Sequence, residues 1–271
     1  MKEIVITIGL GQLGRLFSEA FLLSGCVVLP VRRQDSIADA AHAARALQPS
    51  NANRPPIWLV AVGEDDLQDV LKELPPEASG RVLLIQNELR PEQWSDLQLN
   101  PTLAIIWFEK KGKKAPHIVL PSVISGPLAP IVHNALKTLD LDARELPEHD
   151  EAKLIHELIL KNLYILCLNF AGLAGAKTAA SLLDAQQGTL KKIFDEVLHL
   201  EKAAFARTHP TTPIQPNLLW TDLQKALQAD PDHGCAGRSA PRRLERTLDL
   251  ARALHLQIPQ LNLLQQSHLN Q

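Results

Sequence analysis

The sequence predicts an α/β domain built on a doubly wound parallel sheet, followed by an all-helical C-terminal domain. Short runs rich in β-branched residues alternate with helical patterns through the first half of the 271 residues. A strand-helix-strand order of this kind closes as a parallel sheet with right-handed crossovers. Beyond Pro127 the strand-like runs almost vanish and helical periodicity takes over. We therefore expect one domain at residues 1–126 and a second at residues 127–271.

The first domain contains five predicted strands, short runs rich in β-branched and apolar residues that are expected to be buried on both faces. They are residues 4–8, 27–31, 57–62, 82–85 and 103–108. Helical patterns separate the first four strands, at residues 12–23, 36–47 and 65–74. A basic turn at residues 110–114 precedes two shorter apolar runs and is expected to be a solvated hairpin.

The second domain is read as five helices separated by loops rich in Pro and Gly. Their ranges are 130–139, 151–183, 190–208, 217–229 and 241–255. The most apolar stretch of the chain, residues 154–174, contains Lys161, Asn162 and Asn169. It also contains His156 and Glu157, and ionisable and polar groups at that density are costly in hydrocarbon, so this stretch predicts a buried core helix and no membrane span.

Composition excludes several classes of protein. Lys and Arg total 28 against 30 Asp and Glu, and the formal net charge of -2 offers no attraction to nucleic acid or to an anionic membrane. Three scattered cysteines without a CxxC pair predict neither a disulfide framework nor a cysteine zinc site. His156 and Glu157 lack the second histidine of a zinc motif, so no metal is expected. The first apolar run is too short for a signal peptide, and we expect a cytoplasmic protein.

Glycines at fixed offsets follow the first predicted strand and open the first predicted helix. The motif is Gly9-Leu10-Gly11-Gln12-Leu13-Gly14. In a dinucleotide-binding turn the first glycine permits the tight turn, the second lets the backbone approach a pyrophosphate, and the third lets helix and strand pack closely. The helix N-terminus then presents N–H groups to the anion. These residues predict a dinucleotide site, and the alternative is a glycine turn without a ligand.

Two arginines follow the second predicted strand, at a position whose residue type indicates whether NAD or NADP binds. Arg32 and Arg33 occupy the place where an NAD-preferring site has an acid that accepts hydrogen bonds from the ribose hydroxyls. Guanidinium groups pair with phosphate instead, so the pattern predicts NADP. The alternative is a solvated loop in which Asp35 serves as a late acid. A site for S-adenosylmethionine ranks lower, because methyl transfer has no use for the arginines.

Several motifs together resemble the ketopantoate reductase family, which belongs to the 6-phosphogluconate dehydrogenase-like superfamily. Besides the glycine motif and Arg32, the resemblance extends over most of the chain, at residues 59–62, 84–87, 125–128, 221–224 and 237–238 and along the helix through Asn169. It implies an N-terminal Rossmann domain, a helical second domain, and reduction of a small 2-keto acid by NADPH in the cleft between them. It also implies a small-molecule substrate and is compatible with a homodimer.

The resemblance also assigns residues on the long helix. Lys161 matches the family's general-acid lysine, and Asn169 matches a helix asparagine that binds substrate. The intermediate asparagine of the pattern falls at Ile165, and Asn162 is its replacement in the substrate site. A register shifted by three residues would put Leu158 at the lysine position and Asn162 at the first asparagine.

Other positions are assigned in the same way. Asn87 matches the asparagine beside the nicotinamide and substrate, and Val62 ends the third strand at the cofactor. Thr221 takes the place of a serine hydroxyl that grips the substrate.

Three positions depart from the family pattern. Glu88 stands where a glycine follows the asparagine, Gly63 where a lysine follows the third strand, and Pro241 where a glutamate is expected. Three functions therefore stay open: a reductase of a small 2-keto acid, a dehydrogenase of another substrate such as an imine or opine, and a catalytically silent NADP-binding regulatory protein.

Helix geometry supports Lys161 independently of the resemblance. Asn162 and Asn169 are seven residues apart and share a helix face, with Lys161 roughly a quarter turn away. A carbonyl that is being reduced develops negative charge on oxygen, which a lysine can protonate and an asparagine can hydrogen-bond. Burial in this apolar sequence would lower the pKa of Lys161 toward the working range. The alternative is a surface pair between Glu157 and Lys161.

Overall fold

The computed structural model describes residues 2–48, 54–110, 112, 114–147, 150–235 and 237–269. The chain divides into two units. Unit 1 comprises Met1–Asn87 and Gln93–Glu151, and unit 2 comprises Glu88–Glu92 and Ala152–Gln271. The predicted boundary after residue 126 is therefore wrong. Residues 127–151 belong to unit 1 because the helix and the strand that they form pack on its sheet.

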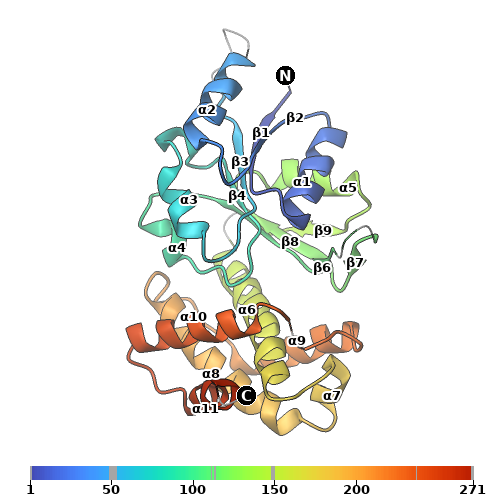
Figure 1. The fold of residues 1–271 in the computed structure, drawn as a ribbon, viewed down its shortest axis with the longest axis vertical. Coiled ribbons are helices and arrows are strands. Elements are labelled where there is room, and N and C mark those ends of the chain that lie inside the picture. The colour runs from blue at the N-terminus through green and yellow to red at the C-terminus, as the bar shows by residue number, and fades with distance from the viewer. Residues whose placement is uncertain are drawn as a thin grey trace. The chain divides into compact units, whose positions relative to one another are not determined.

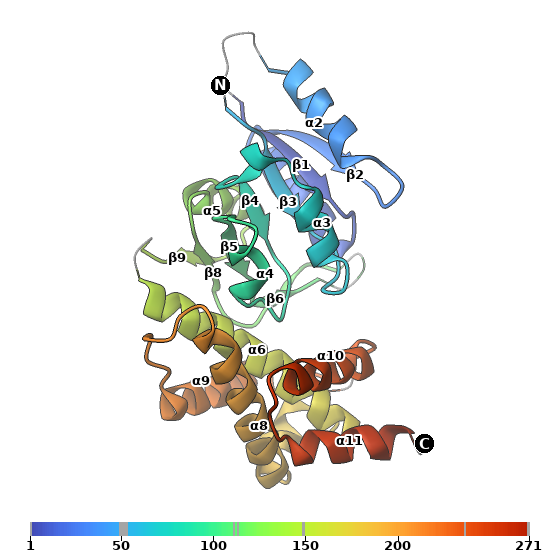
Figure 2. The ribbon, with the colours of Figure 1, turned by 90° about the vertical axis from the view of Figure 1, so that its left-hand side faces the viewer.

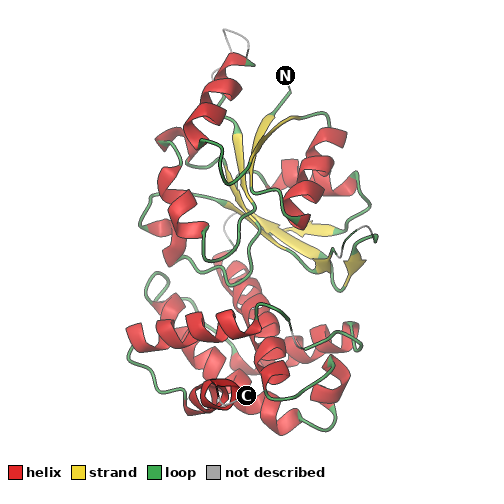
Figure 3. Cartoon of the chain, viewed as in Figure 1, coloured by secondary structure: helices red, strands yellow, loops and turns green. Residues whose placement is uncertain are grey.

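In the described part of unit 1, seven strands form the main sheet, in the order β2-β1-β3-β4-β5-β8-β9 (Figures 1 and 3). They are β1 (Ile4–Ile8), β2 (Val27–Val31), β3 (Ile57–Val60), β4 (Val82–Leu84), β5 (Thr102–Ile105), β8 (Ser122–Ser125) and β9 (Ala143–Glu145). The first five pair in parallel, as predicted. β8, one of the shorter apolar runs that follow the five predicted strands, joins the sheet antiparallel to β5.

Burial along the strands follows their place in the sheet. β1, β3, β4 and β5 are buried at every residue, which explains why their sequences are almost entirely apolar. β2 lies at the edge and is partly exposed, and an edge strand tolerates the missing N–H of Pro30. Two short strands, β6 (Phe108–Glu109) and β7 (His117–Ile118), form a separate hairpin. The basic turn of this hairpin includes Lys111 and Lys113, which lie outside the described residues.

Helices cover both faces of the sheet. Figure 1 shows α1 (Gln12–Leu23) and α5 (Ala129–Lys137) on one face and α2 (Ile37–Ala46) and α3 (Leu67–Glu73) on the other. Phe17 and Phe21 of α1 pack with Val132 and Leu136 of α5 in the core of unit 1. These contacts hold α5 in unit 1. The single helical turn η1 (Pro76–Ala78) and the short helix α4 (Glu92–Ser95) lie elsewhere in the connections between strands.

Unit 2 is helical, as predicted (Figure 3). Its helices are α6 (Glu151–Leu173), α7 (Ala179–Leu183), α8 (Gln187–Ala206), α9 (Pro216–Ala229), α10 (Ala240–Ala253) and α11 (Pro259–Leu269). The predicted helix 151–183 divides into α6 and α7 because Gly175 takes a φ of +94°, which ends a helix. Sequence periodicity missed α11, which packs against α8 and α10 (Figure 2).

α6 is long and apolar enough to cross a membrane by length and composition alone. In the structure, 72% of its most apolar 18-residue window is buried. Leu163, Leu166 and Phe170 on this helix are fully enclosed. This burial is what the sequence analysis expected of a core helix.

Candidate functional site

Two of the three motif glycines are required by close backbone packing. Gly9 follows β1 with a φ of +92°, and a Cβ at this position would lie 2.7 Å from the carbonyl oxygen of Ala61. A Cβ on Gly14 would lie 2.0 Å from the carbonyl oxygen of Gly9. No side chain fits at either position, because each contact is with rigid backbone. The turn and the first helix therefore pack as tightly as the motif predicts.

Gly11 has a different environment. It is the N-cap of α1, and among the described residues no side chain caps this helix and no heavy atom lies within 4 Å of a Cβ built there. The open end of a helix carries N–H donors and a partial positive charge, which together favour an anion. The exposed residues Gly11 and Gln12 begin this end, whereas the side chain of Leu13 packs partly against the core.

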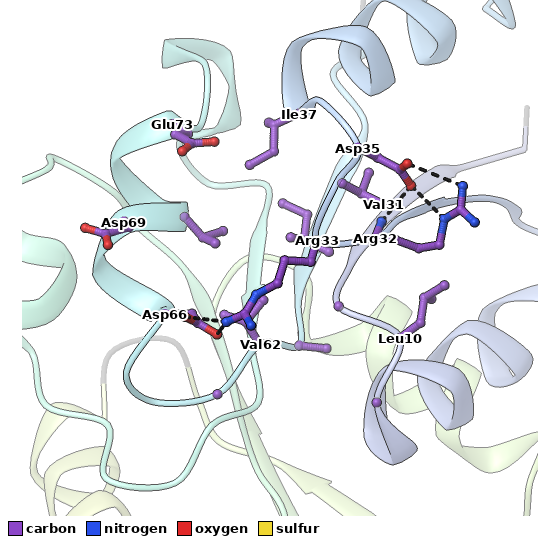
Figure 4. A pocket seen from close by; sticks show the side chains of 16 residues that line it. Leu10, Val31, Arg32, Arg33, Asp35, Ile37, Val62, Asp66, Asp69 and Glu73 are labelled. Atoms are coloured by element: carbon purple, nitrogen blue, oxygen red, sulfur yellow. Dashed lines mark hydrogen bonds and ion pairs between the residues drawn. The ribbon is translucent and has the colours of Figure 1, made fainter.

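A pocket of about 530 Å³ opens beside the turn, and we call it the arginine pocket (Figure 4). It is lined by residues 8–11 of the glycine turn, by Ala61, Val62 and Gly63 after β3, by Val31, Arg32, Arg33 and Asp35 at the end of β2, and by residues of α2 and α3. The predicted cofactor residues Gly9, Leu10, Gly11 and Val62 thus meet the two arginines around one cavity.

Both arginines of the pocket hold carboxylates (Figure 4). Arg32 Nε lies 3.0 Å from Asp35 Oδ2, and the backbone N–H of Arg32 donates to the same oxygen at 2.8 Å. Hydrogen bonds from Arg32 hold the pKa of Asp35 below its usual value. Arg33 Nη2 donates to both carboxylate oxygens of Asp66, at 3.1 and 3.0 Å.

The arginine pocket fits a dinucleotide. Its arginine side chains are 63% and 86% exposed, so water screens their ion pairs with Asp35 and Asp66, and a phosphate can replace the carboxylates. The glycine turn leaves the helix N-terminus open for a pyrophosphate. Within the described residues, no three His, Cys, Asp or Glu side chains gather as metal ligands, and His149 lies outside those residues.

The end of β4 carries Asn87 and a second amide that the sequence analysis missed. Gln86 is buried, and its Nε2 donates to the carbonyl oxygens of Val60 at 2.7 Å and Val62 at 3.3 Å. It thereby ties the carboxyl ends of β3 and β4 together. Asn87 Nδ2 lies 3.5 Å from Glu64 Oε1, a long contact. A polar residue at the end of an otherwise apolar strand was the available signal for Gln86.

Lys161 lies halfway along α6 in unit 2 and is partly buried. Its Nζ lies 5.5 Å from the ring centroid of Tyr164, one turn further along the same helix, within the range of a cation–π contact.

Asn162, by contrast, is buried, and its side chain is hydrogen-bonded inside unit 2. Its side chain donates from Nδ2 to the carbonyl oxygen of Leu89 at 3.2 Å and to Glu201 Oε2 at 3.0 Å, and only 1% of the residue is exposed. Glu201 is fully buried and pairs with Arg90, with 2.5 Å between Oε1 and Nη2. Asn162 therefore completes a buried ion pair, and its role in substrate binding stays a prediction.

We expect Asn162→Ala to lower the free energy of unfolding by about 1–3 kcal/mol, because it leaves a buried carboxylate with one hydrogen bond fewer. Urea unfolding followed by circular dichroism measures the change. Asn217→Ala on the exposed start of α9 is the matched control and should cost much less. A variant of unchanged stability with a raised KM would return Asn162 to the substrate site.

Asn169 lies in a second polar cluster of unit 2. Its Oδ1 accepts a hydrogen bond of 3.1 Å from Arg243 Nη1, and Arg243 in turn binds Glu88. Neither arginine of this cluster, Arg243 or Arg246, was singled out from the sequence, because nothing local in α10 marks them. Thr221 is exposed on α9, where its hydroxyl donates to the carbonyl oxygen of Asn217.

No family model matches this sequence, and no curated protein matches it. Solved structures do. A 2-dehydropantoate 2-reductase from Methylococcus capsulatus has a TM-score of 0.61 at 14% identity, over 97% of this chain and 94% of its own. A probable 2-dehydropantoate 2-reductase from Bacillus subtilis has a TM-score of 0.65 at 18% identity, over 99% of both chains. The chain has the ketopantoate reductase fold.

Other proteins share this fold. D-mandelate dehydrogenase with NADH and anilino(oxo)acetate has a TM-score of 0.63 at 12% identity, over 99% of this chain and 97% of its own. A dimeric ketopantoate reductase from Staphylococcus aureus has a TM-score of 0.58 at 15% identity, over 99% of both chains.

The three departures from the family pattern lie in different local environments. Glu88 has a φ of +58°, the left-handed conformation for which glycine is the usual residue. Pro241 lies in the first turn of α10, where a missing N–H costs no hydrogen bond. Gly63 is exposed at the arginine pocket, and no described heavy atom lies within 4 Å of a Cβ built on it. Only Glu88 brings a new charged group into the interior.

Proposed function

We propose that this chain is an NADPH-dependent oxidoreductase that reduces a small 2-keto acid, as the ketopantoate reductases do. The observation that carries the proposal is the arginine pocket, where an open helix N-terminus and two arginines meet around one cavity. Anion-binding groups at both positions match the pyrophosphate and the 2′-phosphate of NADP. The fold supports the proposed class of reaction, and the residues of the arginine pocket support NADPH as the coenzyme.

Within this proposal the chain's own residues bind the coenzyme, orient the substrate and protonate the carbonyl oxygen. Gly9, Gly11 and Gly14 form the turn for the pyrophosphate, and Arg32 pairs with the 2′-phosphate. NADPH, when bound there, would supply the hydride for the carbonyl carbon. Lys161 delivers a proton to the carbonyl oxygen, so that the keto acid becomes a 2-hydroxy acid, and solvent then reprotonates the amine.

The remaining assigned residues orient the reactants. Asn87 extends from the same edge of the sheet as the glycine turn, where its amide can hydrogen-bond but cannot supply a proton. Asn169 and Thr221 belong to unit 2 and complete the proposed substrate contacts.

Turnover is the direct test of the proposal. The full chain is mixed with NADPH and a panel of 2-keto acids that includes ketopantoate, pyruvate and benzoylformate, and the loss of NADPH absorbance is followed. Reduction of a keto acid is expected. Turnover restricted to imines would favour an imine or opine dehydrogenase. The departures from the family pattern at Gly63 and Pro241 support this alternative. Tight NADPH binding without any turnover would favour a regulatory protein.

Cofactor choice is tested at Arg32. We expect Arg32→Ala to weaken NADPH binding at least about tenfold, or ~1.4 kcal/mol, while NADH binding hardly changes, because only NADPH carries the 2′-phosphate. Titration of coenzyme fluorescence measures both affinities. Arg45→Ala removes an arginine of similar exposure from α2 and should change neither. Equal losses for both coenzymes would contradict the assignment.

We extend the proposal to a homodimer, since a neighbour of the same fold is described as dimeric. Light scattering coupled to size-exclusion chromatography gives the mass in solution, and a monomer at all concentrations would contradict it.

A further inference from the structure

Glu88 is a buried carboxylate of unit 2 on a backbone conformation that favours glycine. It begins the short segment Glu88–Glu92, which follows β4 in the chain but belongs to unit 2. Only 4% of the residue is exposed. Its backbone takes a φ of +58°, a conformation that costs a residue with a Cβ roughly 1 kcal/mol or more. Something must hold the carboxylate in place against this cost.

Two arginines of α10 hold it, and we call them the arginine clamp. Arg243 Nε donates to Glu88 Oε1 at 2.9 Å. Arg246 donates from Nη2 to Oε1 at 2.7 Å and from Nε to Oε2 at 3.3 Å. Their side chains are 12% and 22% exposed, and residues three apart lie on one face of a helix.

The chemistry of the arginine clamp is that of carboxylate recognition. Arg246 uses two nitrogens on the two oxygens of one carboxylate, the paired geometry for which guanidinium is suited. Asn169 Oδ1 accepts from Arg243 Nη1 and so fixes the orientation of that guanidinium. A charge pair with this little exposure is stronger than a surface pair, because less water screens it.

The occupant of the clamp, however, is attached through strained backbone. A glycine at position 88 would adopt the same φ without that cost. It would leave the clamp open to a carboxylate from solution. The side chain of Glu88 thus occupies a preformed carboxylate site.

We propose that the arginine clamp is a binding site for the carboxylate of the substrate, and that Glu88 occupies it as an internal stand-in that a bound 2-keto acid displaces. The inference deepens the proposed function and rests on it for the identity of the acid. It gives Asn169 a defined part, since this asparagine orients Arg243. Substrate affinity is then set by competition between two carboxylates for one pair of guanidinium groups.

Direct binding of oxamate, an unreactive analogue of a 2-keto acid, tests the competition in the full chain. We expect Glu88→Gly to bind oxamate at least about tenfold more tightly than the unchanged protein in isothermal titration calorimetry. Adding Arg246→Met to this variant should abolish the gain. Glu92→Gln, which removes a carboxylate from the same segment, is the matched control and should not raise the affinity.

The opposite results are equally specific. An oxamate affinity that Glu88→Gly leaves unchanged, or a gain that survives Arg246→Met, would show that the cluster only anchors the segment Glu88–Glu92. If Glu88→Gly tightened the binding of chloride as much as that of oxamate, the proposal would also be overturned, since the site would then lack selectivity for carboxylates. Glu88→Gln serves if the glycine variant does not fold, and the same gain is expected.

The clamp proposal and the proposed function can be contradicted independently of each other. Because calorimetry requires no turnover, a positive result with oxamate stands even if no keto acid is reduced. In that case the clamp is a carboxylate site in a protein without the proposed activity. Turnover of keto acids without the oxamate effect would leave the proposed function intact and refute the clamp.

Discussion

Gly14→Ala is expected to lower the free energy of unfolding by at least about 3 kcal/mol and to abolish coenzyme binding. A Cβ at this position would lie 2.0 Å from the carbonyl oxygen of Gly9, so α1 could no longer rest on the turn. Backbone cannot move aside as the end of a flexible side chain can. Urea unfolding and titration of NADPH fluorescence measure the two effects.

Gly11→Ala provides the matched control within the same motif. A Cβ there meets no described heavy atom within 4 Å, and the backbone φ of -65° suits alanine. Stability should change by less than about 1 kcal/mol, whereas NADPH binding should weaken, because the methyl group projects where a pyrophosphate approaches. Equal destabilisation by both substitutions would contradict this division between packing and binding glycines.

Lys161→Ala is expected to reduce kcat for the keto acid by about 10²–10⁴-fold and to leave NADPH affinity unchanged. The reason is that the variant has no group to protonate the oxygen that gains negative charge. Initial rates with saturating NADPH give kcat and KM, and a separate titration gives the coenzyme affinity.

Two further variants separate proton donation from charge alone. Lys161→Arg keeps a positive charge, but the pKa of a guanidinium group lies far above that of an ammonium group, so this variant should stay slow. Lys192→Ala removes an exposed lysine from α8 and should behave as the unchanged protein. Full activity in Lys161→Ala would reject this lysine as donor and favour the register that centres on Asn162.

Features encoded by neighbouring residues could be predicted from the sequence. The glycine turn, α1 and the buried strands β1 and β3 depend on local spacing and on uniform apolar runs, and the structure has them at or within two residues of the expected positions. Arg32 and Arg33 were recognisable because they directly follow a strand end. Because β2, β1 and β3 are parallel neighbours, their carboxyl ends bring Gly9, Gly11, Val62 and both arginines together around one pocket.

Features created by distant pairing could not be predicted in this way. β8 is as buried as the central parallel strands, and its reversed direction depends on which neighbour it joins. Asn162 was assigned to the substrate site from the resemblance and from the helix face that it shares with Asn169. Its partner Glu201 lies on α8, which spacing along one helix does not reveal. The domain boundary failed for the same reason, since α5 is held in unit 1 by contacts with α1.

The segment Glu88–Glu92 also has a consequence for how the chain can be cut and made. The backbone leaves unit 1 for unit 2 after Asn87, returns at Gln93, and leaves again after Glu151. No single cleavage therefore yields two whole units. During synthesis Arg90 emerges from the ribosome well before Glu201, its buried counter-charge, and unit 2 can close only when most of its helices have been made. In a fragment ending at Glu151, Glu88 and Arg90 would lack the partners that unit 2 supplies, so the segment Glu88–Glu92 is expected to lose its structure there.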